Sequence, residues 1–279
     1  MKFSILIAHY NNARFFRDCY ESILQQTYTD WEAVILDDAS SDTEKSIIQE
    51  LISGDKRFRF FENEKNSGVG VTKSKLIELA EGEICGFVDP DDAITPNAIQ
   101  RCIEVFQSKE NTVLTYSRFM TCDDNLKPVA PFRSAMQVPN GNAYFFNFPI
   151  QIAHFVAFRK AIYEKTEKMN PDLKIGEDQD LYLKMYEQGK VRFIDETNYL
   201  YRTHEGGISQ NENKKKSHEY FARVIFDAMK RRGLSTINGK KIPDHYTDSD
   251  EIFDLLQYQH QMPFRLRKKI QITLQSIFG

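Results

Sequence analysis

The feature that most constrains the fold is a regular alternation of short apolar runs and amphipathic stretches over the first 120 residues. The stretch after the first run, for example, places Phe16, Tyr20 and Ile23 at helical spacing. Such alternation predicts an α/β fold with a mostly parallel sheet covered by helices on both faces. The expected strands are residues 3–8, 32–36, 57–61, 84–88 and 113–119, and the expected helices are residues 13–26, 42–52, 70–80 and 96–107, the last with Thr95 as its N-cap.

The pattern becomes irregular after Phe119. Residues 120–150 are rich in Asp, Asn, Pro and Gly, which predicts a long loop or a small antiparallel excursion. Further on we expect a helix over 177–189, strands over 191–194 and 199–202, a helix over 214–232, a linker over 233–249 and a helical tail. A chain of 279 residues therefore suits one large domain over 1–210 with a helical C-terminal extension over 211–279.

Composition excludes several classes of protein. The net charge of -3 does not suit a general nucleic-acid-binding protein, so we expect no nucleic-acid partner. None of the four cysteines forms a C-x-x-C pair, which argues against a zinc site. No signal peptide precedes the apolar run that starts at Phe3, and no apolar stretch approaches the roughly 20 residues of a membrane span. These features predict a cytoplasmic protein whose membrane contact is at most peripheral, at the inner face of the membrane.

Polar residues at the ends of the expected strands are candidates for the site, because ligands of open parallel sheets bind beyond the carboxyl ends of the strands. The first strand ends in residues 8–12 (AHYNN), which lack the glycine-rich turns of dehydrogenases and P-loop NTPases. The second strand ends in residues 37–42 (DDASSD). These carboxylates can accept hydrogen bonds from a nucleobase or a ribose, or can simply cap a helix.

A third strand end carries the sequence D-P-D-D, with carboxylates at Asp89, Asp91 and Asp92. Three carboxylates within four residues repel one another unless a positive charge lies among them. A hard divalent cation such as Mg²⁺ or Mn²⁺ fits this oxygen-rich turn. The alternative is a plain acidic turn, since Pro and Asp both favour turns.

Two later segments add candidate residues. Glu177 and Asp178 open an expected helix, where a carboxylate either interacts with the helix dipole or acts as a general base. Arg202 and His204 follow an expected strand and precede a Gly206-Gly207 pair, which together predict a loop able to close over phosphates. A purely structural histidine is the alternative.

Together, these segments resemble glycosyltransferase family 2, the inverting enzymes of the GT-A fold. The matching stretches are residues 4–11 (SILIAHYN), 25–32 (QQTYTDWE), 37–42 (DDASSD), 66–70 (NSGVG), 89–92 (DPDD) and 176–178 (GED), and their order spans residues 3–210. The resemblance implies a Rossmann-like GT-A domain over 1–210. Its nucleotide-sugar-binding half would cover 1–119 and its acceptor-binding half 120–210.

The resemblance also implies a donor site. Its donor-binding residues would be Ala8, Tyr10, Asp38, Asn66, Gly68, Lys73, Asp89 and Arg202. Ala8 and Tyr10 would line the nucleoside pocket, Asp38 would pair with the base, usually uracil, and Asp89 would lie near the ribose. Lys73 and Arg202 would offset the charge of the diphosphate.

The implied reaction needs a metal and a base. Asp91 and His204 would hold Mn²⁺ or Mg²⁺, and Asp178 would take the proton of an acceptor hydroxyl as the anomeric configuration inverts. The chain departs from the family at Lys73, where the family usually has Arg, because Lys cannot make the bidentate contact. It also has Ser74 and Leu76 where the family usually has Asn and Gly.

The implied function is metal-dependent transfer of a hexosyl or N-acetylhexosaminyl group, with a UDP-sugar as donor and a glycan or lipid-linked acceptor, in polysaccharide synthesis. A sugar-1-phosphate nucleotidyltransferase would need a glycine-rich basic loop after the first strand, which residues 9–12 do not supply. A sugar-nucleotide-binding protein without turnover is a third reading, and the complete acidic set argues against it.

The tail combines apolar residues at helical spacing with positive charge. The apolar residues are Leu266, Ile270, Leu274 and Ile277, and the basic ones are Arg265, Arg267, Lys268 and Lys269. A basic amphipathic helix of this kind can lie on an anionic membrane surface. The alternative is packing on the main domain or, in a homodimer, on a second subunit.

Overall fold

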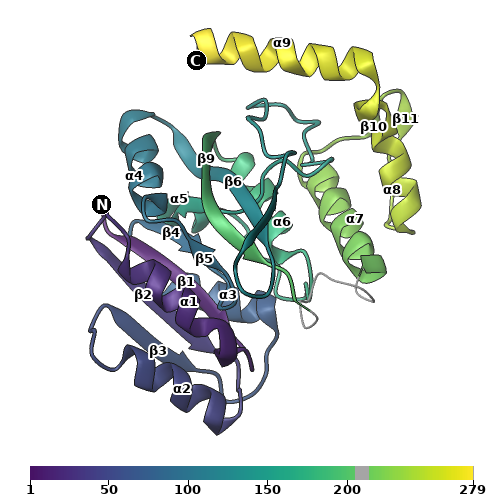
Figure 1. Ribbon diagram of the computed structural model, residues 1–279. Coiled ribbons are helices and arrows are strands. Elements are labelled where there is room, and N and C mark those ends of the chain that lie inside the picture. The colour runs from purple at the N-terminus through teal and green to yellow at the C-terminus, as the bar shows by residue number, and fades with distance from the viewer. Residues whose placement is uncertain (205–213, 279) are drawn as a thin grey trace.

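The computed structural model describes residues 1–204 and 214–278 and has a mixed α/β architecture with a long central sheet between helices (Figure 1). The strands are β1 (Phe3–His9), β2 (Trp31–Asp37), β3 (Phe58–Glu62), β4 (Ile84–Phe87), β5 (Ala93–Ile94), β6 (Thr112–Cys122), β7 (Pro128–Pro131), β8 (Ala157–Arg159), β9 (Lys190–Arg202), β10 (Thr236–Ile237) and β11 (Lys240–Lys241). The helices are α1 (Ala13–Leu24), α2 (Asp42–Ile52), α3 (Val69–Leu79), α4 (Ala98–Ser108), α5 (Lys160–Tyr163), α6 (Glu177–Tyr186), α7 (Lys214–Arg231), α8 (Ser249–Leu256), the short 3₁₀ helix η2 (Gln257–His260) and α9 (Met262–Phe278).

The sheet has a parallel part and a mixed part. Its strand order is β3-β2-β1-β4-β8-β6-β9-β5, and the first four of these strands run parallel. Strand β8 then runs antiparallel to both β4 and β6, while β6 and β9 pair in parallel. The predicted α/β fold with a mostly parallel sheet is confirmed, because β1, β2, β3, β4, β6 and β9 run in the same direction and the short strands β5, β7 and β8 run against them.

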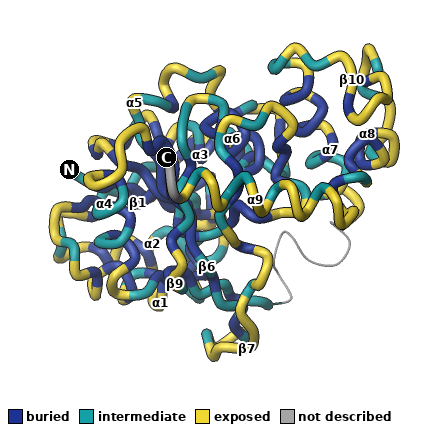
Figure 2. Tube along the Cα trace, turned by 90° about the horizontal axis from the view of Figure 1, so that it is seen from above, coloured by how far each residue is buried: buried dark blue, intermediate teal, exposed yellow. Residues whose placement is uncertain are grey.

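Alternation along β1 explains why helices cover both faces of the parallel part. Ile5 and Ile7 pack in one apolar cluster with Phe16 of α1, whereas Leu6 packs in the opposite cluster with Leu76 of α3. Successive residues of a strand point to opposite faces, so an uninterrupted apolar strand must be covered on both sides. The dark interior of Figure 2 shows the resulting buried layer.

In the later half of the chain, several boundaries of helices and strands differ from those expected from the sequence. The two strands expected at 191–194 and 199–202 form the single strand β9, whose pairing with β6 shifts register along its length. The expected antiparallel excursion is the β7 strand, which pairs with β6. Helix α4 begins at Ala98 with Asn97 in the cap position, so Thr95 is not its N-cap. The predicted linker at 233–249 contains the β10–β11 hairpin.

Two sequence-based expectations receive no test from the arrangement of elements. The division at residue 210 stays a prediction, and the Gly206-Gly207 pair lies outside the described residues. Among the described helices, none has the length and apolar character needed to cross a membrane.

Candidate active site

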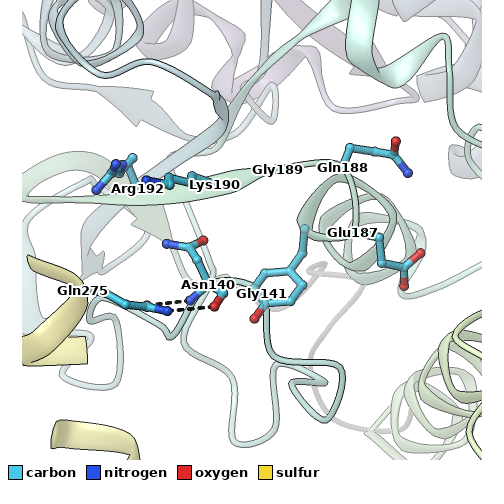
Figure 3. A pocket seen from close by; sticks show the side chains of 9 residues that line it. Asn140, Gly141, Glu187, Gln188, Gly189, Lys190, Arg192 and Gln275 are labelled. Atoms are coloured by element: carbon cyan, nitrogen blue, oxygen red, sulfur yellow. Dashed lines mark hydrogen bonds between the residues drawn. The ribbon is translucent and has the colours of Figure 1, made fainter. Parts of the chain in front are cut away.

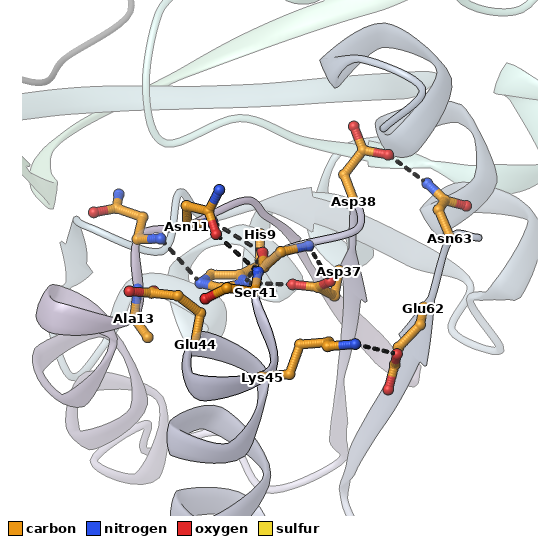
Figure 4. Close-up of polar contacts among 12 residues, drawn as sticks. His9, Asn11, Ala13, Asp37, Asp38, Ser41, Glu44, Lys45, Glu62 and Asn63 are labelled. Atoms are coloured by element: carbon orange, nitrogen blue, oxygen red, sulfur yellow. Dashed lines mark hydrogen bonds and ion pairs between the residues drawn. The ribbon is translucent and has the colours of Figure 1, made fainter. Parts of the chain in front are cut away.

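The loops after β1 and β2 are tied together by a buried contact between His9 and Asp37 (Figure 4). His9 Nδ1 lies 2.7 Å from Asp37 Oδ1, and both side chains are fully buried. The other Asp37 oxygen accepts a hydrogen bond from the Ser40 N–H, and Asn11 Oδ1 accepts one from the Ser41 N–H. These contacts fix the two strand ends against each other. Sequence reasoning gave His9 no role and considered Asp37 only among the carboxylates of the second strand end, although both lie within the matching motifs.

Asp38 holds the turn that opens α3. Its Oδ1 accepts hydrogen bonds from Asn63 Nδ2 and the Ser67 N–H, and its Oδ2 accepts one from the Gly68 N–H, each at 2.8 Å. Gly68 has a φ of +84°, a left-handed conformation that favours glycine. The motif residues of the second strand end and of the N-S-G-V-G turn therefore form one unit.

The residues expected to line the nucleoside pocket lie beside Asp38. The Asp38 N–H donates to the His9 carbonyl at 2.8 Å, which places Asp38 against the end of β1, where Ala8 and Tyr10 flank His9. The Tyr10 side chain is 51% exposed, so its ring is accessible to a ligand. Asn66 is exposed, and its Oδ1 accepts from the Gly68 N–H at 3.1 Å.

The D-P-D-D turn follows β4 and is held by β9. The buried Asp92 accepts hydrogen bonds from Tyr199 Oη and from the Arg202 N–H, both at 2.7 Å. Tyr199 Oη in turn accepts from the Asp89 N–H at 3.1 Å. Burial, together with Asp89 and Asp91, raises the pKa of Asp92. Asp92 is thus an anchor of the turn, while Asp89 and Asp91 remain partly exposed.

The Arg202 side chain is buried and makes its hydrogen bonds to protein groups. It is 1% exposed, and its Nε donates to the Asp91 carbonyl at 2.6 Å. Its Nη2 donates to Asp18 Oδ2 at 2.5 Å, its Nη1 donates to the Asp124 carbonyl, and the guanidinium lies 4.4 Å from the centre of the Phe15 ring. In this arrangement the hydrogen bonds of the guanidinium hold the Asp91 turn, and the expected contact between Arg202 and a diphosphate stays a prediction.

The two residues expected to bind metal lie together. His204 Nε2 is 2.8 Å from Asp91 Oδ2. Within residues 1–204 and 214–278, no group of three Asp, Glu, Cys or His side chains forms a complete metal cage. A cation that shares its coordination with substrate phosphates needs one or two protein carboxylates rather than a cage. The Asp91–His204 pair therefore fits an Mn²⁺ or Mg²⁺ ion completed by diphosphate oxygens.

Lys73 is paired inside the protein. Its Nζ lies 2.7 Å from Oε1 of the buried Glu177, which joins α3 to the first turn of α6. Burial opposes the charged form of Lys73, but Glu177, Asp89 and Asp178 together hold its pKa above the usual value. In the structure this charge balances Glu177, and the expected contact between Lys73 and a diphosphate stays a prediction.

The pKa of Asp178 lies above the usual value of a carboxyl group. Burial and the neighbouring Glu177 raise the pKa of Asp178 to about 6, while Lys73 and the Gln179 N–H act in the opposite direction. Asp89 also contributes to this pKa, so the start of α6 and the D-P-D-D turn lie within electrostatic reach of each other. The structure thus brings the expected catalytic and donor-side carboxylates into one site.

His154 belongs to the same site and was missed by sequence reasoning. Its ring stacks on that of Tyr199 with centroids 4.7 Å apart, and it lies 5.6 Å from the Tyr201 ring. Burial lowers the pKa of His154, against the influence of Asp89 and Asp91. The segment before β8 has no periodic pattern, so a histidine there gave no signal.

Comparisons with known proteins identify relatives of this chain. The chain is 28% identical over 241 residues to chondroitin synthase from Escherichia coli, an alignment that covers 83% of this chain and 33% of the synthase. The chain therefore spans about a third of the length of that relative.

Two solved structures share the fold. TarS from S. aureus in complex with UDP-GlcNAc aligns with a TM-score of 0.70 at 19% identity, covering 93% of this chain and 72% of that one. The mannosyltransferase PcManGT from Pyrobaculum calidifontis, in complex with GDP-Man and Mn²⁺, aligns with a TM-score of 0.58 at 14% identity, covering 99% of this chain and 75% of that one.

The sequence model of the family described as glycosyl transferase family 2 matches residues 4–166, from the first strand through the D-P-D-D turn to the end of α5. This match covers more than half of the chain and includes the ends of β1 and β2, the N-S-G-V-G turn and the D-P-D-D turn. The chain belongs to glycosyltransferase family 2, as the ordered motifs indicated.

Proposed function

We propose that the protein is an inverting glycosyltransferase that moves a hexosyl or N-acetylhexosaminyl group from a UDP-sugar to an acceptor hydroxyl. The observation that carries the proposal is Asp178, a carboxylate with a pKa of about 6 that lies within electrostatic reach of Asp89 on the D-P-D-D turn. A general base needs a pKa near the working pH. The relationship to a chondroitin synthase supports a role in polysaccharide synthesis.

In the proposed reaction, Asp178 removes the proton from the acceptor hydroxyl while its oxygen attacks the anomeric carbon of the donor. The bond between that carbon and the diphosphate oxygen breaks on the opposite face, and the nucleoside diphosphate leaves with the bonding electrons. The configuration inverts, so an α-linked donor gives a β-linked product. The proton stays on Asp178 until solvent removes it.

A divalent cation, Mn²⁺ or Mg²⁺, bound by Asp91 and His204 would neutralise negative charge on the leaving diphosphate. Arg202 prepares this part of the site, because it holds the Asp91 carbonyl and its backbone N–H holds Asp92. The Mn²⁺ complex of the structurally similar mannosyltransferase supports the use of a cation.

Asp38 is the proposed partner of the base. A carboxylate has about four acceptor positions, and contacts with Asn63, Ser67 and Gly68 occupy three. The remaining position on Oδ2 can accept a hydrogen bond from a uracil N–H, with the exposed Tyr10 ring beside it. The proximity of Asp89 to the ribose and a direct contact between Lys73 and the diphosphate stay predictions.

The acceptor side is proposed to include the aromatic group around His154. The rings of His154 and Tyr201 are partly exposed and lie beside the residues that hold the D-P-D-D turn. Aromatic faces suit the apolar faces of sugar rings, so this group is the expected contact for a glycan or lipid-linked sugar acceptor.

The test is to incubate the protein and Mn²⁺ with a panel of UDP-, GDP- and dTDP-sugars and candidate oligosaccharide acceptors. We expect acceptor-dependent release of UDP and a β-linked product by NMR. An α-linked product would contradict inversion, and binding of donors without turnover would favour a sugar-nucleotide-binding protein. Formation of nucleotide sugar from a sugar phosphate and a nucleoside triphosphate would favour a nucleotidyltransferase.

A further inference from the structure

Helix α9 presents its apolar side to the solvent. Met262, Leu266, Ile270 and Leu274 are 74%, 61%, 52% and 51% exposed, and they recur at intervals of four residues. Residues spaced by four form one continuous stripe along a helix. A surface helix of a globular protein normally turns such a stripe toward the core. We call these four residues the α9 stripe.

Polar contacts on the opposite side fix this orientation. Gln275 hydrogen-bonds to both the N–H and the carbonyl of Asn140, each at 2.9 Å (Figure 3). Earlier in the same helix, Lys268 Nζ donates a hydrogen bond to Gln151 Oε1. Two attachment points along the helix therefore hold its polar side against the body. Figure 1 shows α9 along the edge of the molecule, and Figure 2 shows its exposed positions.

The α9 stripe is bordered by positive charge. The helix contains Arg265, Arg267, Lys268 and Lys269 and has no acidic residue. At 100° per residue, the exposed Arg267 falls on one side of the stripe and the exposed Arg265 and Lys269 fall on the other. The whole chain carries a net charge of -3, so this concentration of positive charge is a local feature.

We propose that α9 docks the protein on an anionic phospholipid surface, with the stripe in the headgroup boundary and Arg265, Arg267 and Lys269 on lipid phosphates. A helix with an apolar stripe between cationic borders lies in the plane of such an interface. Charge complementarity favours this occupant over a second copy, because two α9 helices packed stripe to stripe would bring like charges together.

Docking through α9 would place the acceptor half of the protein nearest to the lipid. Asn140 and Gln151, to which α9 is attached, lie in the segment that leads to His154. A lipid-linked sugar acceptor would then be concentrated on the same surface. The docking itself does not depend on the proposed reaction.

The test is flotation of the full-length protein with phosphatidylcholine vesicles, with and without phosphatidylglycerol. We expect binding to the phosphatidylglycerol vesicles and weaker binding at high salt. The double variant Leu266→Glu/Ile270→Glu should lower the partition coefficient by about tenfold or more, because it places acidic groups in the headgroup boundary. Val129→Glu is the matched control, since Val129 on β7 is 68% exposed and lies outside α9.

Absence of flotation with either vesicle, or flotation unchanged in the double variant, would overturn the proposal. So would a dimer in solution that the double variant converts to a monomer while vesicle binding is absent, which would assign the stripe to a second copy. Circular dichroism of both variants reports folding. UDP binding, measured separately, reports the donor site, so failure of the docking and failure of the proposed reaction can be told apart.

Discussion

Lys73 Nζ lies 2.7 Å from Glu177 Oε1, and this buried ion pair connects residues that are 104 positions apart in the sequence. It links α3, which begins within the N-S-G-V-G turn, to α6, which carries Asp178. The same contact neutralises a carboxylate beside the proposed base, so it contributes both to the assembly of the site and to its electrostatics.

Removal of Lys73 should therefore destabilise the protein. Lys73→Met leaves the buried Glu177 without its partner, and breaking a buried pair in this way costs about 3–5 kcal/mol. Chemical denaturation measures the loss, and the double variant Lys73→Met/Glu177→Gln should recover part of it. Lys75→Met is the control: this exposed lysine on the same helix contacts Asn63, so its loss should cost under about 1 kcal/mol. Equal losses in the two lysine variants would contradict the role of the pair.

Asp178→Asn should lower kcat by roughly 10²- to 10⁴-fold, because Asn cannot accept the acceptor proton. Affinity for UDP with Mn²⁺ should change little, since the base acts on the acceptor and not on the nucleotide. Steady-state kinetics and calorimetry measure the two quantities, with the exposed Asp172→Asn as control. Activity lost solely through weaker donor binding would argue against this assignment, and Glu177 would then be tested.

The activity should depend on pH in the acid range. Burial and Glu177 raise the pKa of Asp178 to about 6, and the base works in its ionised form. Activity should therefore be full above this value and fall as pH decreases through about 6, approaching a tenfold loss per pH unit. The measurement is kcat as a function of pH between about 5 and 8, the range in which such a base titrates. A flat profile would exclude a titrating base with this pKa.

Asp38→Asn should weaken nucleotide binding more than it lowers kcat at saturating donor. The substitution removes a charged acceptor for the base and disturbs the contacts with Ser67 and Gly68. Hydrogen bonds to charged groups contribute about 1.5–3 kcal/mol, so the Kd for UDP should rise by roughly 10- to 150-fold. Asp42→Asn is a control in the same loop, because the Asp42 side chain is 98% exposed. A kcat defect with unchanged UDP affinity would contradict the proposed role.

Metal removal should abolish turnover. We expect no acceptor-dependent UDP release in excess EDTA, recovery on addition of Mn²⁺, and loss of most activity in Asp91→Ala. UDP binding followed by calorimetry should show the same dependence on the cation, which separates a metal effect on binding from one on chemistry. Full activity in EDTA would contradict the proposal that Asp91 and His204 bind a metal ion needed for turnover.

The sequence predicted the parallel half of the fold well because its strands are short apolar runs that alternate with helical stretches, of which the first and the fourth are strongly amphipathic. The same regularity located Asp38 and the D-P-D-D turn at strand ends. Strand β8 has three residues and no turn signal around it, so its antiparallel insertion, and with it His154, could not be read from the pattern.

Pairings over long separations were also beyond the sequence. From the family resemblance, Lys73 and Arg202 were expected to offset the charge of a diphosphate, and the motifs indicated no protein partner for either cation. A motif does not reveal that a carboxylate more than a hundred positions away will reach the same cation, as Glu177 does for Lys73 and Asp18 does for Arg202. These contacts depend on how the sheet brings its two halves together.

The contacts made by the Arg202 side chain have a consequence for folding during translation. They tie Asp18 in the first helix to the Asp91 and Asp124 carbonyls, and Arg202 is the last of these residues to leave the ribosome. A nascent chain that stops before residue 202 contains the donor motifs but lacks the group that holds the Asp91 turn. Nucleotide-dependent protection from proteolysis should therefore begin during translation only after β9 has emerged.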